Sequence, residues 1–196
     1  MKKLFLTLTA LIWVAPASFA GTITYTATLL GTSENPATGS PGTGEAIVTI
    51  NTLAQTMEVN VVFSGLTGTS TASHIHCCET APNLNANVGV ATTTPTFTGF
   101  PLGVTAGTYD HLFDLTLAST YNPSFVTAEG SLANAEAALL GGLANDETYL
   151  NIHTTVFPGG EIRGILAATP EPATLFLAGT ALLGLGVLRR RTKRTD

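Results

Sequence analysis

The chain has 196 residues and a formal net charge of −5, with only eight Lys and Arg residues. Seven of these eight lie at the two ends, so residues 21–169 carry Arg163 as their one cation beside eleven acidic residues, a net charge of −10. This balance argues strongly against nucleic-acid binding, which needs cations to neutralise phosphates, and suits an extracellular domain that meets divalent cations.

The N-terminus has the three parts of a secretory signal peptide. Lys2 and Lys3 supply positive charge, residues 4–14 form an apolar run, and residues 18–20 (SFA) give the small-x-small pattern that precedes cleavage. An apolar run of this length is too short for a permanent membrane anchor. We therefore expect the first 20 residues to be removed, leaving a mature protein that begins near Gly21 outside the cytoplasm.

Residues 173–188 form a second apolar stretch, sixteen residues without a charge. A spanning helix usually has roughly 17 to 25 residues, but flanking arginines can snorkel and bilayers can thin. Five cations follow, and such clusters stay on the cytoplasmic side. They are Arg189, Arg190, Arg191, Lys193 and Arg194. We predict a transmembrane helix over 173–188 with the body outside; a buried core helix is the alternative, which the adjoining cations disfavour.

The C-terminal segment TPEPATLFLAGTALLGLGVLRRRTKR resembles the PEP-CTERM sorting signal of Gram-negative bacteria. It has the same parts in the same order: the triplet Pro170, Glu171 and Pro172, a short hydrophobic helix, and an arginine cluster. The resemblance implies export by the secretion machinery, tethering to the inner membrane facing the periplasm, cleavage by an exosortase, and release or attachment at the cell surface. It also implies a bacterium that makes exopolysaccharide or biofilm matrix, so exopolysaccharide and surface proteins are expected partners.

The chain therefore divides into a signal peptide (1–20), a body (21–169) and a sorting and anchor segment (170–196). The body has the size of one domain, and its Thr, Val and Gly content favours strands. Strands are predicted over residues 22–29, 45–51, 56–63, 72–77, 109–117, 148–154 and 161–166, and one helix over 132–145. The segment 79–107 is predicted to be a long functional or self-packed loop. Seven short strands and one helix indicate an all-β fold, an antiparallel β-sandwich or barrel.

Three segments of the body resemble the CHRD domain, which is named from chordin and is common in exported bacterial proteins. They are GSPGTGEAIVTI, VVFSGLTGTSTASHIHC and YLNIHTTVFPGGEIRGIL, in the order and spacing of that family. The resemblance covers nearly all of residues 22–166 and implies an immunoglobulin-like fold without established enzymatic activity. Many members have HIHG where Cys77 and Cys78 follow His76 here, so any role of the cysteines concerns at most a subgroup.

Two histidines in SHIHCCE carry the strongest chemical signal. His74 and His76 are two residues apart on a predicted strand, so their side chains share a face, and imidazole suits zinc or copper. His153 in NIHT is the expected third ligand, and the carboxylate of Glu161 is placed to complete the site. The alternative is a set of core histidines that hydrogen-bond across the sheet without metal. His111 is expected at the surface.

Cys77 and Cys78 are the only cysteines, so an internal disulfide in an oxidising compartment must join adjacent residues. A reduced pair, a metal ligand and an intermolecular bridge are the alternatives. Arg163 is expected to pair with a carboxylate at the sheet surface, since a buried position would require such a partner.

Two functions follow from these features. The first is a non-enzymatic surface or matrix module, which agrees with the absence of a GxSxG motif or any other marked nucleophile, so that no catalytic residue is assigned. The alternative is an extracytoplasmic copper- or zinc-binding or redox protein that uses the histidines.

Overall fold

The computed structural model describes residues 21–80 and 85–169. The expected signal peptide, the Pro-Glu-Pro triplet, the apolar stretch 173–188 and the basic cluster all lie outside these ranges. Among the described residues there is no helix with the length and apolar character needed to cross a membrane.

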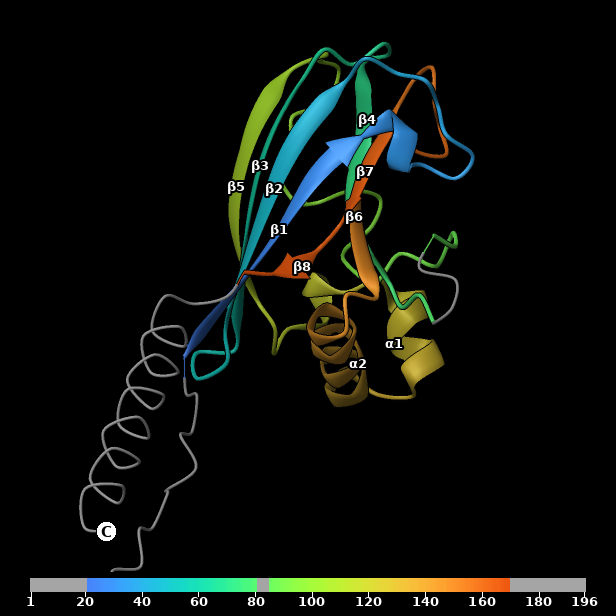
Figure 1. Ribbon diagram of the computed structural model, residues 1–196. Helices are drawn as coiled ribbons and strands as arrows, with labels where there is room; N and C mark the ends of the chain where they lie inside the picture. The colour runs from blue at the N-terminus through green and yellow to red at the C-terminus, as the bar shows by residue number, and fades with distance from the viewer. Residues whose placement is uncertain (1–20, 81–84, 170–196) are drawn as a thin grey trace, which may run out of the picture.

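Eight strands form one antiparallel sheet that curls into a half-barrel (Figure 1). Their order is β4-β6-β7-β1-β2-β3-β5, and β8 pairs with β1 beside β7. The strands are β1 (Thr22–Leu30), β2 (Thr43–Asn51), β3 (Thr56–Ser64), β4 (Ser70–Cys77), β5 (Gly107–Asp114), β6 (Thr148–Thr154), β7 (Ile162–Ile165) and β8 (Ala167–Ala168). The predicted antiparallel β architecture is confirmed. The two facing sheets of a sandwich do not form, because β7 pairs with both β6 and β1 and joins the halves into one sheet.

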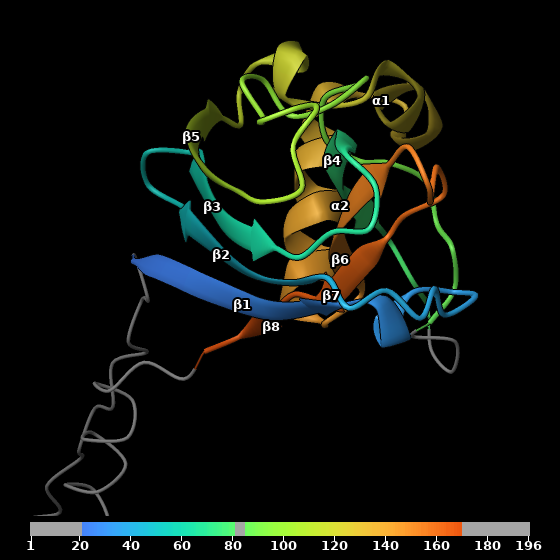
Figure 2. The ribbon, with the colours of Figure 1, turned by 90° about the horizontal axis from the view of Figure 1, so that it is seen from above.

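Two α-helices follow β5, where the sequence predicted only one. The predicted helix is α2 (Leu132–Ala144), capped by the Ser131 side chain, which accepts from the amide of Asn134. The additional helix is α1 (Pro123–Glu129), which follows the short 3-10 helix η2 (Ala118–Thr120). Both α-helices lie at one end of the half-barrel (Figure 1), and α2 is seen within the curve of the sheet when viewed from above (Figure 2).

The inner face of the sheet carries the apolar core. Alternate residues of β2 and β3 are buried, among them Val48 and Val59, which lie directly opposite each other. The long connection between β4 and β5 closes part of this core with Phe97 and Phe100. The described part of the segment 79–107 therefore packs on the core of the domain, whereas its role as a functional or self-packed loop stays a prediction.

The outer face of β4, β6 and β7 is polar, although most of it is buried. His74 lies opposite Asn151, which in turn lies opposite Arg163, and His76 lies opposite Tyr149. Residues opposite each other on paired strands point to the same face, so this face of the sheet gathers imidazole, amide, phenol and guanidinium groups. Loops from 31–38, 85–96 and 155–160 contribute the groups that these side chains bond.

Candidate functional site

Three of the four histidines meet on this outer face. His74 and His76 come from β4 and His153 from β6, and the centroids of their rings are 5.2 to 6.1 Å apart. One ring nitrogen of each lies within 4.8 Å of the corresponding nitrogen of the other two. His74 and His76 are buried, and His153 is half-buried. The structure therefore brings together the three histidines that the HxH and NIHT patterns selected.

Each ring donates one hydrogen bond to a carbonyl oxygen of a loop. Because a carbonyl oxygen can only accept, the bonded nitrogen must carry the proton, and this fixes the neutral tautomer of every ring. The bonds run from Nε2 of His74 to Pro95 O (2.8 Å), from Nδ1 of His76 to Val88 O (2.7 Å) and from Nδ1 of His153 to Pro158 O (2.8 Å).

The second nitrogen of each ring then carries a lone pair and has no hydrogen-bond partner. These atoms are Nδ1 of His74, Nε2 of His76 and Nε2 of His153, and all three are buried. Three acceptors cannot satisfy one another, and buried polar atoms are rarely left unpaired. A group that accepts all three lone pairs at once is a metal ion, and a histidine that bonds a carbonyl through its other nitrogen is typical of metal ligands.

The electrostatics of the cluster keep the histidines neutral. Burial lowers the pKa of His74 to about 4 and that of His76 to about 4, against the opposing effect of their bonds to Pro95 and Val88. Burial also lowers the pKa of His153 below its ordinary value. At neutral pH the unpartnered ring nitrogens therefore carry no proton. The rings are in the neutral form that binds a metal.

The donor set suits zinc or copper. Imidazole nitrogen is a common ligand of both, and three protein ligands leave a fourth position open for water or another ligand. Within the described residues, no carboxylate or thiol joins the three rings. Of the expected copper or zinc site, the structure shows a buried triad of histidines that can hold such an ion.

Glu161, the expected fourth ligand, does not join the histidines. Its carboxylate is buried and accepts hydrogen bonds from four donors in three other segments. The donors are the hydroxyls of Ser40 and Thr154 and the amides of Thr67 and Gly68. Burial acts to raise the pKa of Glu161, but these bonds together bring it below its ordinary value. Glu161 thus joins two loops to the end of β6 as an ionised carboxylate.

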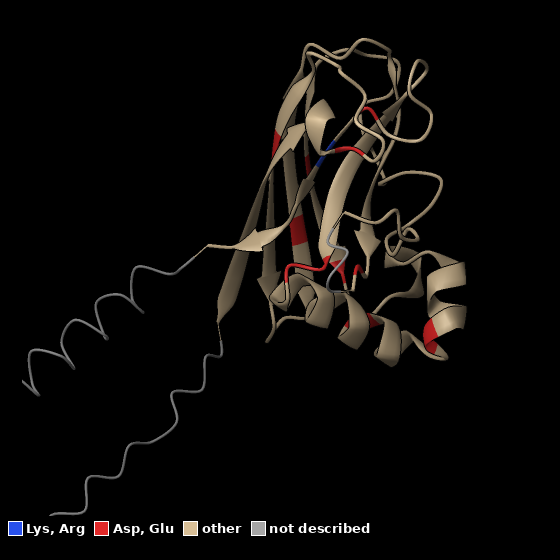
Figure 3. Cartoon of the chain, turned by 45° about the vertical axis from the view of Figure 1, so that its right-hand side comes forward, with Lys and Arg blue, Asp and Glu red and all other residues tan. Residues whose placement is uncertain are grey.

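Arg163 is buried, with 1% of its surface exposed, and not at the sheet surface as predicted. Its guanidinium donates to the carbonyl of Ser33 and to groups of the 85–87 segment, and the Glu34 carboxylate lies 3.9 Å from its Nε. The expected carboxylate partner is present, and it comes from the loop that follows β1. Figure 3 shows this lone cation of the described chain beside acidic residues.

Arg163 also connects to the histidines through an aromatic ring. Its guanidinium lies 4.5 Å from the centroid of the Tyr149 ring, and that ring stacks on His76 with centroids 4.6 Å apart and planes 10° from parallel. The three planar groups fix one another across β7, β6 and β4. Glu34 and Tyr149 were missed from the sequence; the need of a buried arginine for a carboxylate partner is a signal for Glu34 only.

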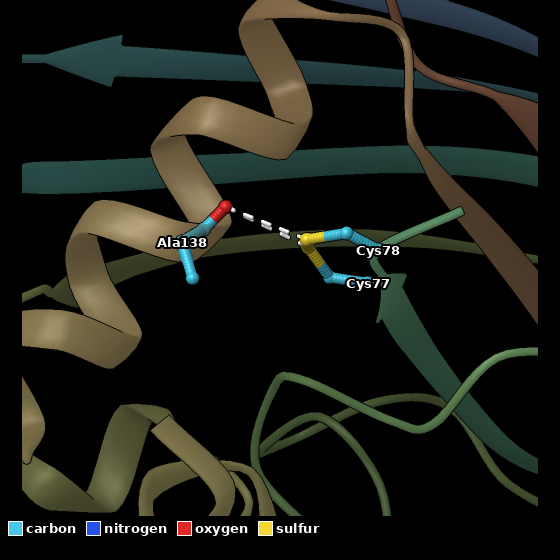
Figure 4. Close-up of a disulfide and its surroundings, with 3 residues drawn as sticks. All are labelled: Cys77, Cys78 and Ala138. Carbon is cyan, nitrogen blue, oxygen red and sulfur yellow. Dashed lines mark hydrogen bonds between the residues drawn. A yellow bond between two sulfur atoms is a disulfide. The ribbon is translucent and has the colours of Figure 1, made fainter. Parts of the chain in front are cut away.

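Cys77 and Cys78 form a disulfide on the other side of the sheet. Cys77 faces Thr148 on the inner face, one residue after His76 on the outer face, so neither sulfur reaches the histidines. Both sulfurs lie against α2, within 3.7 Å of the carbonyl oxygen of Ala138 (Figure 4). The helix has Gly142 at this contact, where a Cβ would lie 2.7 Å from the Cys77 sulfur.

Comparison with known families agrees with this architecture. The family model of the CHRD domain matches residues 25–166, and that of the PEP-CTERM protein-sorting motif matches residues 168–191. The chain is thus an antiparallel β protein with an exosortase-type sorting motif, which implies export to the cell surface. It belongs to the CHRD domain family, as the sequence resemblance indicated. No curated protein and no solved structure matches it.

Proposed function

We propose that this CHRD domain protein is a non-enzymatic module of a bacterial surface or matrix, and that its body binds one zinc or copper ion through His74, His76 and His153. Two observations support the metal site: each of the three rings has one buried nitrogen without a hydrogen-bond partner, and one ligand nitrogen of each ring lies within 4.8 Å of those of the other two. The alternative of a metal-free histidine cluster requires each ring to be satisfied, and in this arrangement each ring is satisfied at one nitrogen only.

The bound ion would act mainly as a structural link. A cation shared by the three imidazoles ties β4 to β6, and through the carbonyls of Pro95, Val88 and Pro158 it fixes the loops that cover the outer face. Binding energy available only in the folded state adds to stability. Loops carry the binding residues of many folds, so we expect these covering loops to form the surface for a partner.

The acidic body and the sorting motif support a role at the cell surface. Exosortase processing would leave residues 21–169 outside the inner membrane, where exopolysaccharide or other surface proteins would be the partners. A net charge of −10 on the body keeps it soluble there and favours contact with cations. This part of the proposal rests on the sorting motif at 168–191.

Metal analysis of the protein, expressed with its own signal and purified after export, tests the metal site. We expect about one zinc or copper ion per chain, with the ion lost in the His74→Ala and His153→Ala variants. His111→Ala is the matched control, since His111 lies on β5 away from the cluster, and it should keep the ion. A folded protein that contains neither metal, and takes up neither on titration, would contradict the proposal.

A further inference from the structure

The histidine cluster supplies three of the four ligands that a zinc ion usually takes. Structural zinc sites are tetrahedral and are closed by four protein ligands, whereas catalytic sites keep one position for water. His74, His76 and His153 offer three nitrogens, and no carboxylate or thiol in the described part of the chain lies among them. A fourth ligand from this protein must therefore be a side chain of another kind.

One further buried acceptor on this face of the sheet has no hydrogen-bond partner. It is Oδ1 of Asn151, a residue with 1% of its surface exposed. Asn151 lies opposite His74 on β4 and opposite Arg163 on β7, so strand pairing on both sides fixes its backbone and places its side chain on the face of the histidines. Buried amide oxygens without a donor are uncommon in folded proteins, so this oxygen is in a position where a cation would be stabilised.

The two ends of the Asn151 amide face different neighbours. Nδ2 lies toward the loop between β6 and β7, where a Cβ on Gly160 would be 2.9 Å from it. Burial is the largest effect on the pKa of His76 and lowers it, and the Asn151 side chain acts in the opposite direction. An amide has this effect through its oxygen, which accepts from a protonated ring, so Oδ1 lies on the side of His76.

This places two acceptors next to each other. Nε2 of His76 carries a lone pair and has no hydrogen-bond partner, and the same is true of Oδ1 of Asn151. Neither atom can donate to the other while Nδ1 of His76 keeps its proton on the carbonyl of Val88. Two such lone pairs repel each other unless a cation lies between them.

Tyr149, the other polar neighbour of His76, is directed away from this place. Its ring stacks on the imidazole, and its hydroxyl points to the carbonyl of Val88, the same oxygen to which Nδ1 of His76 donates. The phenol oxygen therefore lies on the protonated side of the imidazole and not on the side of Nε2. Asn151 is left as the side chain that can add an oxygen to the three nitrogens.

We propose that Oδ1 of Asn151 is the fourth ligand, so that three imidazoles and one amide oxygen close the site around the ion. This inference rests on the metal site proposed above and extends it. Four protein ligands leave no position for water or a substrate, which makes the ion a structural link between β4 and β6 rather than a catalytic centre.

Cobalt(II) as a spectroscopic substitute for zinc, with azide as a probe for an open position, tests the closed site on the unaltered protein. We expect the exported protein, stripped of metal, to take up one cobalt(II) ion with the strong visible absorption of four-coordinate cobalt, and azide to leave that absorption unchanged. A spectrum that shifts with azide would show an open fourth position; it would overturn the role of Asn151 and leave the histidine site standing. Failure to take up either cobalt or zinc would remove the metal site and this inference with it.

Variants of Asn151 then test the ligand itself. Asn151→Ala should lower the affinity for zinc by about tenfold to a hundredfold, measured by competition with a chromogenic chelator, and its cobalt spectrum should shift with azide, because the open position accepts the anion. Asn151→Asp keeps an oxygen ligand and adds a negative charge beside the ion, so it should bind zinc at least as tightly as the unaltered protein.

Asn60→Ala is the matched control, since Asn60 lies on β3, which β7, β1 and β2 separate from β6 in the sheet. It should change neither the affinity for zinc nor the response to azide. An unchanged affinity in Asn151→Ala, or an equal loss in Asn60→Ala, would contradict the assignment of Asn151 as a ligand.

Discussion

At the scale of single residues, two of the buried carboxylates, those of Glu161 and Glu34, have different surroundings. Glu161 is satisfied by four donors and holds loops together, whereas Glu34 pairs with Arg163 only at long range. Neither carboxylate is part of the histidine cluster. Their different surroundings give opposite pKa shifts, and this leads to two distinct predictions.

Glu161→Gln should destabilise the domain. The carboxylate accepts hydrogen bonds from Thr67, Gly68, Ser40 and Thr154. The NH2 group of glutamine is itself a donor, so it would face donors where an acceptor is needed. We expect a loss of about 2–4 kcal/mol in the free energy of unfolding, measured with a chemical denaturant, since several bonds to a charged group are disturbed. The same substitution at the exposed Glu45 should change it by less than about 0.5 kcal/mol. Equal effects at the two positions would contradict this role.

Glu34 should make stability fall as the pH rises. Burial raises its pKa in the folded state from the ordinary 4.5 to about 7, so the folded state holds this proton more tightly than the unfolded state does. Its contribution is complete below pH 4.5 and is lost as the pH rises through 7. Glu34→Gln removes the effect, so the stability of the unaltered protein relative to the variant should decrease between pH 5 and pH 8. A difference that is constant across this range would exclude the shift.

At the scale of elements, the contact between the disulfide and α2 depends on one of two adjacent glycines. A Cβ at Gly142 would lie 2.7 Å from the Cys77 sulfur and 2.8 Å from that of Cys78, whereas a Cβ at Gly141 meets nothing within 4 Å. The two residues have the same helix propensity, so substitution by alanine separates packing from propensity.

Gly141→Ala should raise the melting temperature, because alanine favours the helix by about 0.8–1 kcal/mol over glycine. Gly142→Ala should lower it, because the gain in propensity is smaller than the cost of displacing the disulfide from the helix, about 1–3 kcal/mol for overpacking. Thermal unfolding followed by circular dichroism gives both values. If the two variants are stabilised alike, the helix does not pack on the sulfurs.

The strands and α2 were predictable because each has a periodic pattern of its own. Residues 148–154 were predicted with the same limits as β6, and 132–145 differs from α2 by one residue. The helix α1 was missed because its seven residues are too few to show a repeating helical pattern. Its signals are the Asn122 cap, the proline that follows it, and Gly130 in the left-handed conformation at φ 83°.

The three histidines were predictable as a group, but their surroundings were not. The two-residue period of a strand places His74 and His76 on one face, and NIHT repeats this pattern. The pairing of β4 with β6 and the carbonyls of Val88, Pro95 and Pro158 depend on tertiary structure far along the chain. The same holds for Glu34, which the sequence shows only as one acid in a turn-rich loop.

At the scale of the whole molecule, one curled sheet has an apolar inner face and, on β4, β6 and β7, a polar outer face. The inner face holds the apolar core and the disulfide, and the outer face holds the histidines, Arg163 and Tyr149 under a cover of loops. A single sheet with both faces buried explains why β4 has a nearly continuous buried pattern rather than strict alternation. The surface offered to partners is therefore formed by the covering loops and the exposed face of β1, β2, β3 and β5.

The sorting motif predicts a change in the size and location of the protein. Replacing Pro170, Glu171 and Pro172 by alanine should leave the unprocessed protein, with its C-terminal segment, in the membrane fraction of the native host. The unaltered protein should be shorter by about the length of this segment and appear at the surface or in the medium, as intact-mass measurement and cell fractionation would show. Thr169→Ala should be processed normally. Normal processing of the triple variant would contradict the assignment of the motif.

Anomalous X-ray diffraction at the zinc and copper absorption edges, on crystals of the exported protein, would locate a transition metal held by His74, His76 and His153. The tautomers fixed by the loop carbonyls predict one anomalous peak bounded by Nδ1 of His74, Nε2 of His76 and Nε2 of His153. No peak between these atoms after soaking with either metal, or a peak only at the cysteines or Glu161, would contradict it.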